Sequence, residues 1–247
     1  TLPVALEGQD IIGQAKTGTG KTLGFGIPLL MDTLGPGEEG WDEDPASGSP
    51  QGLVILPTRE LAKQVAEELS TAAAKRTVRI VQVYGGRAYE PQIEDLERGA
   101  EVVVGTPGRL IDLMDRGVLD LTHVTTVVLD EADEMLDLGF LPDVEKILAR
   151  TRADRHTMLF SATMPGAVVT LARRYMTRPT HIRAQDPGDE GMTVQTVQQV
   201  VYRTHSMNKV EVVARILQAE GRGRTIIFAR TKRTAARVAD DLRARGF

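Results

Sequence analysis

Short apolar runs alternate with amphipathic stretches along most of this chain. The runs are rich in Val, Ile and Leu and fall at 10–13, 53–56, 78–83, 101–104, 127–130 and 157–160. Between the runs, apolar residues recur at helical spacing, most clearly over 21–34 and 60–74. Buried strands that alternate with helices usually form a parallel sheet covered on both faces, so the pattern predicts an α/β fold.

Two segments interrupt this alternation. Residues 35–52 are acidic, rich in Gly, Pro and Ser, and include Trp41, so we expect a flexible surface insertion. Breaker residues cluster again near 185–191, and a new pattern follows, strand-like at 194–202 and 225–228 and helical at 209–218 and 235–245. The sequence therefore predicts a first domain over 1–186, a linker over 187–193 and the opening of a second α/β domain over 194–247.

Composition narrows the class of protein. Hydrophobic residues make up 41% of the chain and aromatic residues 4%, so we expect an aliphatic core. No apolar run approaches the roughly 20 residues that span a bilayer, and the absence of cysteine excludes disulfides and thiolate metal sites. These features fit a cytoplasmic protein without a membrane partner. Residues 194–247 carry eleven Lys/Arg against four Asp/Glu, which suits either a polyanion or solvated helix faces.

A glycine-rich loop links the first predicted strand to the first predicted helix. Its glycines let backbone N–H groups converge on phosphates at a helix N-terminus, so we expect ATP to bind there. Lys21 would reach the β- and γ-phosphates, and the Thr22 hydroxyl would bind Mg²⁺. An ordinary surface turn is the alternative, which the Gly-Lys-Thr order at this place disfavours. The residues of the expected ATP-binding loop are Ala15, Lys16, Thr17, Gly18, Thr19, Gly20, Lys21 and Thr22.

Acidic residues follow the predicted strand at 127–130. In a chain with a phosphate-binding loop, a carboxylate at such a strand end is placed to hold Mg²⁺, and Asp130 is that candidate, partly through water. The next residue, Glu131, is a candidate base toward an attacking water. The alternative is an acidic cap on the following helix, which would be the better reading without the phosphate-binding loop.

The segment Asp130-Glu131-Ala132-Asp133 also resembles the signature of the DEAD-box RNA helicases of superfamily 2. Further segments similar to that family's motifs follow in its order, at 57–62 (motif Ia), 85–86 (the GG element), 106–109 (motif Ib), 161–163 (motif III) and 226–228 (the start of motif IV). The resemblance implies a RecA-like ATP-binding domain followed by part of a second one. It also implies ATP hydrolysis that is stimulated by RNA and separates short duplexes or remodels RNA–protein complexes.

The same resemblance implies roles for individual residues. The hydroxyls of Ser161 and Thr163 would form hydrogen bonds with Asp133, which would couple the nucleotide site to the RNA face. The residues expected to contact the RNA backbone are Thr58, Arg59, Gly86, Thr106, Gly108 and Arg109. Backbone contacts of this kind predict binding that is independent of base sequence. Structural ion pairs are the alternative for the two arginines, and a simple hydroxyl turn is the alternative at 161–163.

Two parts of the family pattern are missing from this chain. The glutamine that reads adenine lies upstream of a segment similar to residues 1–6, and the arginine-finger motif lies beyond motif IV. We therefore expect the chain alone to have little RNA-stimulated ATPase activity. A DNA-directed ATPase of the same superfamily and a non-catalytic RNA clamp are the rival functions. The residue order at 57–61 and at 130–133 disfavours a DNA-directed ATPase. A non-catalytic clamp is disfavoured by Lys21, Asp130 and Glu131.

Overall fold

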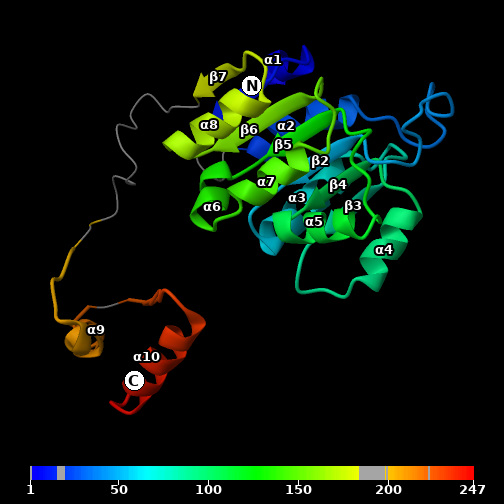
Figure 1. The fold of residues 1–247 in the computed structure, drawn as a ribbon. Coiled ribbons are helices and arrows are strands. Elements are labelled where there is room, and N and C mark those ends of the chain that lie inside the picture. Colours follow the sequence, from blue (N-terminus) through cyan, green and yellow to red (C-terminus); the bar gives the residue numbers. More distant parts are fainter. Residues whose placement is uncertain (1, 16–19, 184–197, 199, 222) are drawn as a thin grey trace. The chain divides into compact units, whose positions relative to one another are not determined.

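A seven-stranded parallel sheet forms the core of the first part of the chain (Figure 1). The computed structural model describes residues 2–15, 20–183, 198, 200–221 and 223–247. Within them the sheet has the order β3-β4-β2-β5-β6-β1-β7, and the predicted α/β fold is confirmed. The strands are β1 (Ile11–Gln14), β2 (Gly52–Ile55), β3 (Ile80–Val83), β4 (Val102–Gly105), β5 (Thr126–Leu129), β6 (His156–Ser161) and β7 (Thr180–Arg183).

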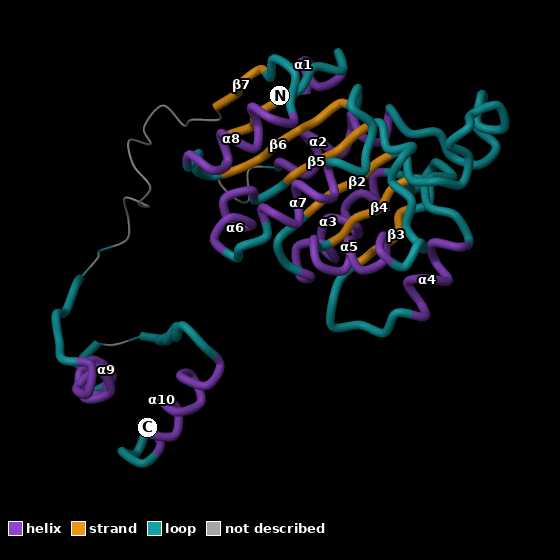
Figure 2. The backbone as a smooth tube through the Cα atoms, viewed as in Figure 1, coloured by secondary structure: helices purple, strands orange, loops and turns teal. Residues whose placement is uncertain are grey.

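Helices cover both faces of this sheet (Figure 2). They are α1 (Leu2–Leu6), α2 (Lys21–Met31), α3 (Arg59–Ala72), α4 (Glu90–Glu97), α5 (Pro107–Asp115), α6 (Ala132–Asp137), α7 (Leu141–Leu148) and α8 (Gly166–Tyr175). Successive strand residues point to opposite faces, so Val103 packs in the cluster with α5, α7 and α8, whereas Val102 and Val104 pack in the cluster with α2 and α3. The core is aliphatic, as the composition predicts.

Because every strand pair in this sheet is parallel, the carboxyl ends of the strands lie along one edge. Within the first unit, each motif that the sequence singled out begins where a strand ends: the glycine-rich loop after β1, the motifs at 57–62, 85–86 and 106–109 after β2, β3 and β4, the acidic segment after β5, and 161–163 at the end of β6. This edge is where open α/β sheets bind ligands. The topology alone therefore gathers the candidate residues.

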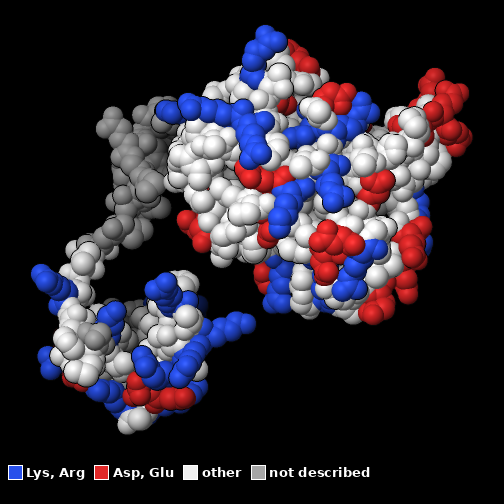
Figure 3. All heavy atoms as spheres, in the orientation of Figure 1, with Lys and Arg blue, Asp and Glu red and all other residues white. Residues whose placement is uncertain are grey.

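The acidic insertion is anchored at its base. Its residues form turns up to Gln51, and Gly52 already belongs to β2. Arg76 pairs with Glu38, and Gln51 makes reciprocal hydrogen bonds of 2.9 and 3.0 Å with the backbone of Leu34. Arg76 thus neutralises and fixes one of the acids at the base, and the flexibility expected over 35–52 stays a prediction. Acidic side chains remain at the exposed tip (Figure 3).

The chain divides into two units, Thr1–Asp189 and Glu190–Phe247. The second contains α9 (Lys209–Leu217) and α10 (Lys232–Arg243), which pack through a small apolar cluster. The strand expected at 225–228 does not form, and Phe228 is 90% exposed, because a strand needs neighbours to satisfy its backbone. The described residues of 194–202 form no strand either, and the expected linker over 187–193 lies outside the described residues.

Candidate functional site

A lysine and two carboxylates meet at the carboxyl edge of the sheet. Lys21 is the first residue of α2, and its Nζ lies 2.6 Å from Glu131 Oε1 and 3.3 Å from Asp130 Oδ1. All three side chains are only 8% exposed. The fully buried strand β5 delivers the two acids, and Glu131 adopts a left-handed conformation with φ of 54° while its N–H donates to Asp130 Oδ1. Few non-glycine residues adopt this conformation, so the turn between β5 and α6 is a specialised one.

Burial and charge act against each other in this cluster. Burial raises the pKa of Asp130, although the ammonium of Lys21 opposes the rise. Burial alone would lower the pKa of Lys21, but the charges and hydrogen bonds of Asp130 and Glu131 outweigh it and raise that pKa. Lys21 is therefore held charged between two acidic partners.

The predicted phosphate-binding loop is described only in part. Gly20 precedes α2 in a left-handed conformation with φ of 75°, and Thr22 lies half-buried in the first turn of α2. Four of the predicted loop residues lie outside the described residues: Lys16, Thr17, Gly18 and Thr19. Ala15 is described at the end of β1 and is half-buried.

The residues present fit a magnesium ion that is shared with a phosphate ligand. The Thr22 hydroxyl and the Asp130 carboxylate are oxygen donors, the kind that Mg²⁺ prefers. Among the described residues, no group of three or more His, Cys, Asp and Glu side chains could hold a metal ion by itself. A partial set of protein ligands is the usual arrangement where water and substrate phosphates complete the shell of Mg²⁺.

Asp133 is tied to the end of β6 as the resemblance implied. Thr163 donates to Asp133 Oδ2 from its hydroxyl at 2.7 Å and from its backbone N–H at 2.8 Å. The backbone N–H of Asp133 donates to Ser161 Oγ at 3.1 Å. Burial alone would raise the pKa of Asp133, but these hydrogen bonds outweigh it and hold the pKa below its ordinary value. The carboxylate therefore stays charged and fixed in place.

One further hydrogen bond in this region was not predicted from the sequence. Gln14, the last residue of β1, donates from Nε2 to the backbone oxygen of Ala162 at 3.2 Å. The end of the strand that precedes the glycine-rich loop is thereby joined to the segment that holds Asp133.

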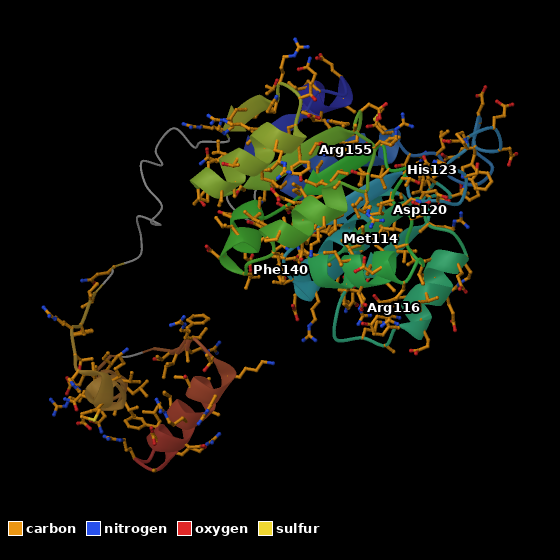
Figure 4. The ribbon with its side chains drawn as sticks, viewed as in Figure 1. Met114, Arg116, Asp120, His123, Phe140 and Arg155 are labelled. Carbon is orange, nitrogen blue, oxygen red and sulfur yellow. The ribbon has the colours of Figure 1, made fainter. Side chains whose placement is uncertain are left out.

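A hollow in the surface lies along the same edge of the sheet. It has a volume of about 520 Å³ and contains five of the six residues predicted to contact RNA. Gly86, the sixth, lies beside it, because a Cβ built on Gly86 would come 3.2 Å from Arg59 Nη1. Several other lining residues had no role predicted from the sequence, including Tyr89, Asp112 and Phe140, which is labelled in Figure 4. The lining residues are Pro57, Thr58, Arg59, Glu60, Gly85, Tyr89, Thr106, Gly108, Arg109, Asp112 and Phe140.

The two predicted arginines lie in different environments. The Arg59 side chain is 61% exposed and pairs with Glu60 at 2.5 Å. Arg109, by contrast, is 9% exposed, lies within α5 rather than in a loop, and donates from Nη2 to the backbone oxygen of Arg87 at 3.0 Å. The ion pair that was the structural alternative is therefore seen at Arg59, on the surface, whereas the guanidinium of Arg109 is engaged within the protein by a backbone oxygen.

The comparisons with known proteins agree with this geometry. The family model of the DEAD/DEAH box helicases matches residues 1–171. The chain is 43% identical over its whole length to the DEAD-box ATP-dependent RNA helicase CshA of Geobacillus kaustophilus, of which it covers 50%. It is 42% identical over its whole length to the ATP-dependent RNA helicase CshA of Listeria monocytogenes, of which it covers 45%. The chain thus spans about half the length of these relatives.

Solved structures show the same fold. A DEAD box protein from Methanococcus jannaschii matches the whole chain over 62% of its own length, with 36% identity and a TM-score of 0.68. A hypothetical ATP-dependent RNA helicase from Sulfolobus tokodaii matches 74% of the chain over 50% of its own, with 38% identity and a TM-score of 0.65. These neighbours confirm the predicted RecA-like fold. On the family match and the shared fold together, the chain belongs to the DEAD/DEAH box helicase family.

Proposed function

We propose that this chain is the ATP-binding part of an ATP-dependent RNA helicase. One observation carries the proposal: a single sheet edge holds both the cluster of Lys21, Asp130 and Glu131 and the hollow that contains Arg59, and Asp133 and Thr163 connect the ends of β5 and β6 at that edge. The names of the relatives, which are RNA helicases, support the same substrate.

The nucleotide would bind where Lys21 now meets two carboxylates. Phosphate oxygens of ATP would replace Glu131 as the partner of the Lys21 ammonium, and Glu131 would then be free to orient a water and accept its proton. Thr22 and Asp130 would hold Mg²⁺, partly through water, and the metal when bound neutralises phosphate charge. The chain's own contribution is to position the water and to place a fixed positive charge at the β- and γ-phosphates.

RNA would bind across the hollow on the same edge. Phosphates of the RNA would be contacted by Thr58, Thr106 and the exposed guanidinium of Arg59. Gly86 has no side chain and would let the RNA strand approach the protein backbone. The N-terminus of α5 would add the N–H groups of Gly108 and Arg109. These groups are cations, hydroxyls and backbone donors, so binding would depend on the RNA backbone and not on its sequence.

The contacts of Asp133 suggest how the two ligands communicate. Its carboxylate belongs to the acidic segment after β5, and its partners belong to the end of β6. A shift of Glu131 toward a bound nucleotide would move Asp133, two residues along the chain, and with it the segment at 161–163. Binding of one RNA strand in the ATP state would then separate a short duplex or displace a bound protein.

Phosphate release by the native protein tests this proposal. We expect single-stranded RNA to stimulate release and DNA of the same base sequence to stimulate it far less. Equal stimulation by DNA would favour a DNA-directed ATPase, and RNA binding without turnover would favour a non-catalytic clamp. Either result would overturn the proposed function.

A further inference from the structure

An aromatic and arginine cluster lines part of the hollow, and its side chains have no role in the function proposed above. Tyr89 lies in the segment between β3 and α4, directly before α4. Its neighbours Arg109 and Asp112 belong to α5, and Arg116 follows that helix and is labelled in Figure 4. The cluster therefore joins the loop that contains Gly86 to the helix that begins at the hollow.

The Tyr89 side chain makes three contacts across this junction. The Arg109 Cζ atom lies 3.8 Å from the centroid of the Tyr89 ring, and the Arg116 Cζ atom lies 4.2 Å from it. The phenol hydroxyl donates a hydrogen bond to the carboxylate of Asp112. Arg116 Nε also pairs with Asp112 Oδ1 at 3.2 Å, so the cluster is closed by an ion pair.

Arg109 depends on this ring more than an exposed arginine would. The residue is 9% exposed, and its Nη1 is buried without a hydrogen-bond partner among the described residues, while Nη2 donates to the backbone oxygen of Arg87. A buried cation with an unpaired donor is costly unless another group compensates its charge. The face of an aromatic ring provides such compensation, most strongly where water is excluded.

The two elements that the cluster joins are also two walls of the hollow. Gly85 lines it from the loop after β3, and Thr106 and Gly108 line it from the start of α5. The spacing between these walls sets where successive phosphates can be held. A change in the cluster therefore reaches the binding face without removing any group that contacts RNA.

We propose that Tyr89 is a positioning residue for RNA binding. Its ring holds the Arg109 side chain and its hydroxyl holds Asp112, so that the loop at 85–89 and the N-terminus of α5 keep a fixed spacing. The proposal rests on the proposed function, because it concerns the same RNA-binding face. Without the ring, the two walls would move independently, and RNA would have to order them on binding.

The test compares Tyr89→Phe with Tyr89→Leu in the native protein, with binding of a labelled single-stranded RNA measured by fluorescence anisotropy. Phenylalanine keeps the ring, so RNA affinity should stay within about threefold of the wild type. Leucine removes the ring, and RNA affinity should fall about five- to thirtyfold, the effect of losing a partly buried cation–π contact. ATP affinity should not change in either variant.

A matched control and a double variant separate positioning from general stability. Tyr175 also carries an arginine against its ring, since Arg174 Cζ lies 5.3 Å from the centroid, but it belongs to α8 and does not line the hollow. Tyr175→Leu should leave RNA affinity unchanged. Adding Arg109→Ala to Tyr89→Leu should cause little further loss, because both changes remove the same contact.

Three results would overturn the proposal: wild-type RNA affinity in Tyr89→Leu, a full additional loss from Arg109→Ala, or parallel losses of RNA and ATP affinity. If the wild type itself bound no RNA, the proposed function would fail instead. Amide hydrogen exchange would then test the cluster separately. Exchange over 85–89 and α5 should rise in Tyr89→Leu and not in Tyr89→Phe, and unchanged exchange would contradict the role of the ring.

Discussion

Replacing Lys21 with methionine removes the ammonium that lies between two buried carboxylates while keeping a side chain of similar length. The two contacts, of 2.6 and 3.3 Å, join groups that are 8% exposed, and removing one partner of a buried ion pair typically costs 3–5 kcal/mol. Asp130 keeps the hydrogen bond from the N–H of Glu131, so we expect the free energy of unfolding to fall by an amount near the lower limit, about 3 kcal/mol at pH 7. For a unit of this size the melting temperature should fall by about 6–12 °C.

The loss should depend on pH in a defined direction. Burial already raises the pKa of Asp130, and the loss of Lys21 removes the opposing charge and raises it further. A carboxyl whose pKa is higher in the folded state than in the unfolded state loses stability as pH rises between those two values. The difference between wild type and variant should therefore be smallest near pH 4, the ordinary range of Asp, and largest at pH 7.

Urea unfolding followed by circular dichroism at pH 5 and pH 7 measures both effects. Lys63→Met is the matched control, because Lys63 is 63% exposed and its nitrogen lies 3.8 Å from Glu67, so its loss should cost less than about 0.5 kcal/mol. If Lys21→Met were as stable as this control at pH 7, Lys21 would not hold the two carboxylates in the folded chain, and the electrostatic account of the cluster would fail.

Three further changes test other parts of the account. Glu131→Gln should keep nucleotide affinity within a few-fold in calorimetry and abolish phosphate release, because an amide cannot accept the proton of water; persistent turnover would leave Glu131 only as a partner of Lys21. Thr163→Val should lower the free energy of unfolding by about 1 kcal/mol at pH 7, a loss that the partial exposure of Asp133 keeps small. Thr163→Ser keeps the hydroxyl and should not lower it. Because the pKa of Asp133 is held low, this difference should disappear as acid protonates Asp133 through its lowered pKa, and a difference that persisted would point to packing instead. Arg76→Ala should release the base of the insertion and shift the fluorescence of Trp41 to longer wavelength, whereas Arg98→Ala, at an exposed pair, should not; an unshifted spectrum would show that Arg76 does not anchor the segment.

The strands could be predicted from sequence wherever they are buried on both faces. In β2, β4 and β5 all four residues are buried, so each strand is a continuous apolar or small-residue run. Strand β7 at the sheet edge alternates half-buried and exposed residues and shows no apolar run, and it was missed. The run at 225–228 is apolar but has no neighbouring strand among the described residues, so apolarity alone did not make it a strand.

The site could be predicted from the sequence only for those residues that the sheet topology places at the carboxyl edge. The positions of Lys21, Asp130 and Asp133 follow from the parallel topology, because each lies in the loop or the first helical turn that follows a strand. The environment of Arg109 does not follow from it, since Tyr89 lies twenty residues earlier in the chain and the contact between them depends on how α4 and α5 pack. The ion pair between Arg76 and Glu38 could not be predicted for the same reason, because composition does not indicate a partner 38 residues away in the chain.

The cluster around Lys21 and the hollow that contains Arg59 are proposed to act as coupled binding sites for ATP and RNA. The most direct test measures the affinity of the native protein for a single-stranded RNA with and without a non-hydrolysable ATP analogue. We predict that the analogue tightens RNA binding by about tenfold or more, within the usual range of coupling between two sites, and that Thr163→Val reduces this factor. An RNA affinity that is the same with and without the analogue would contradict the claim.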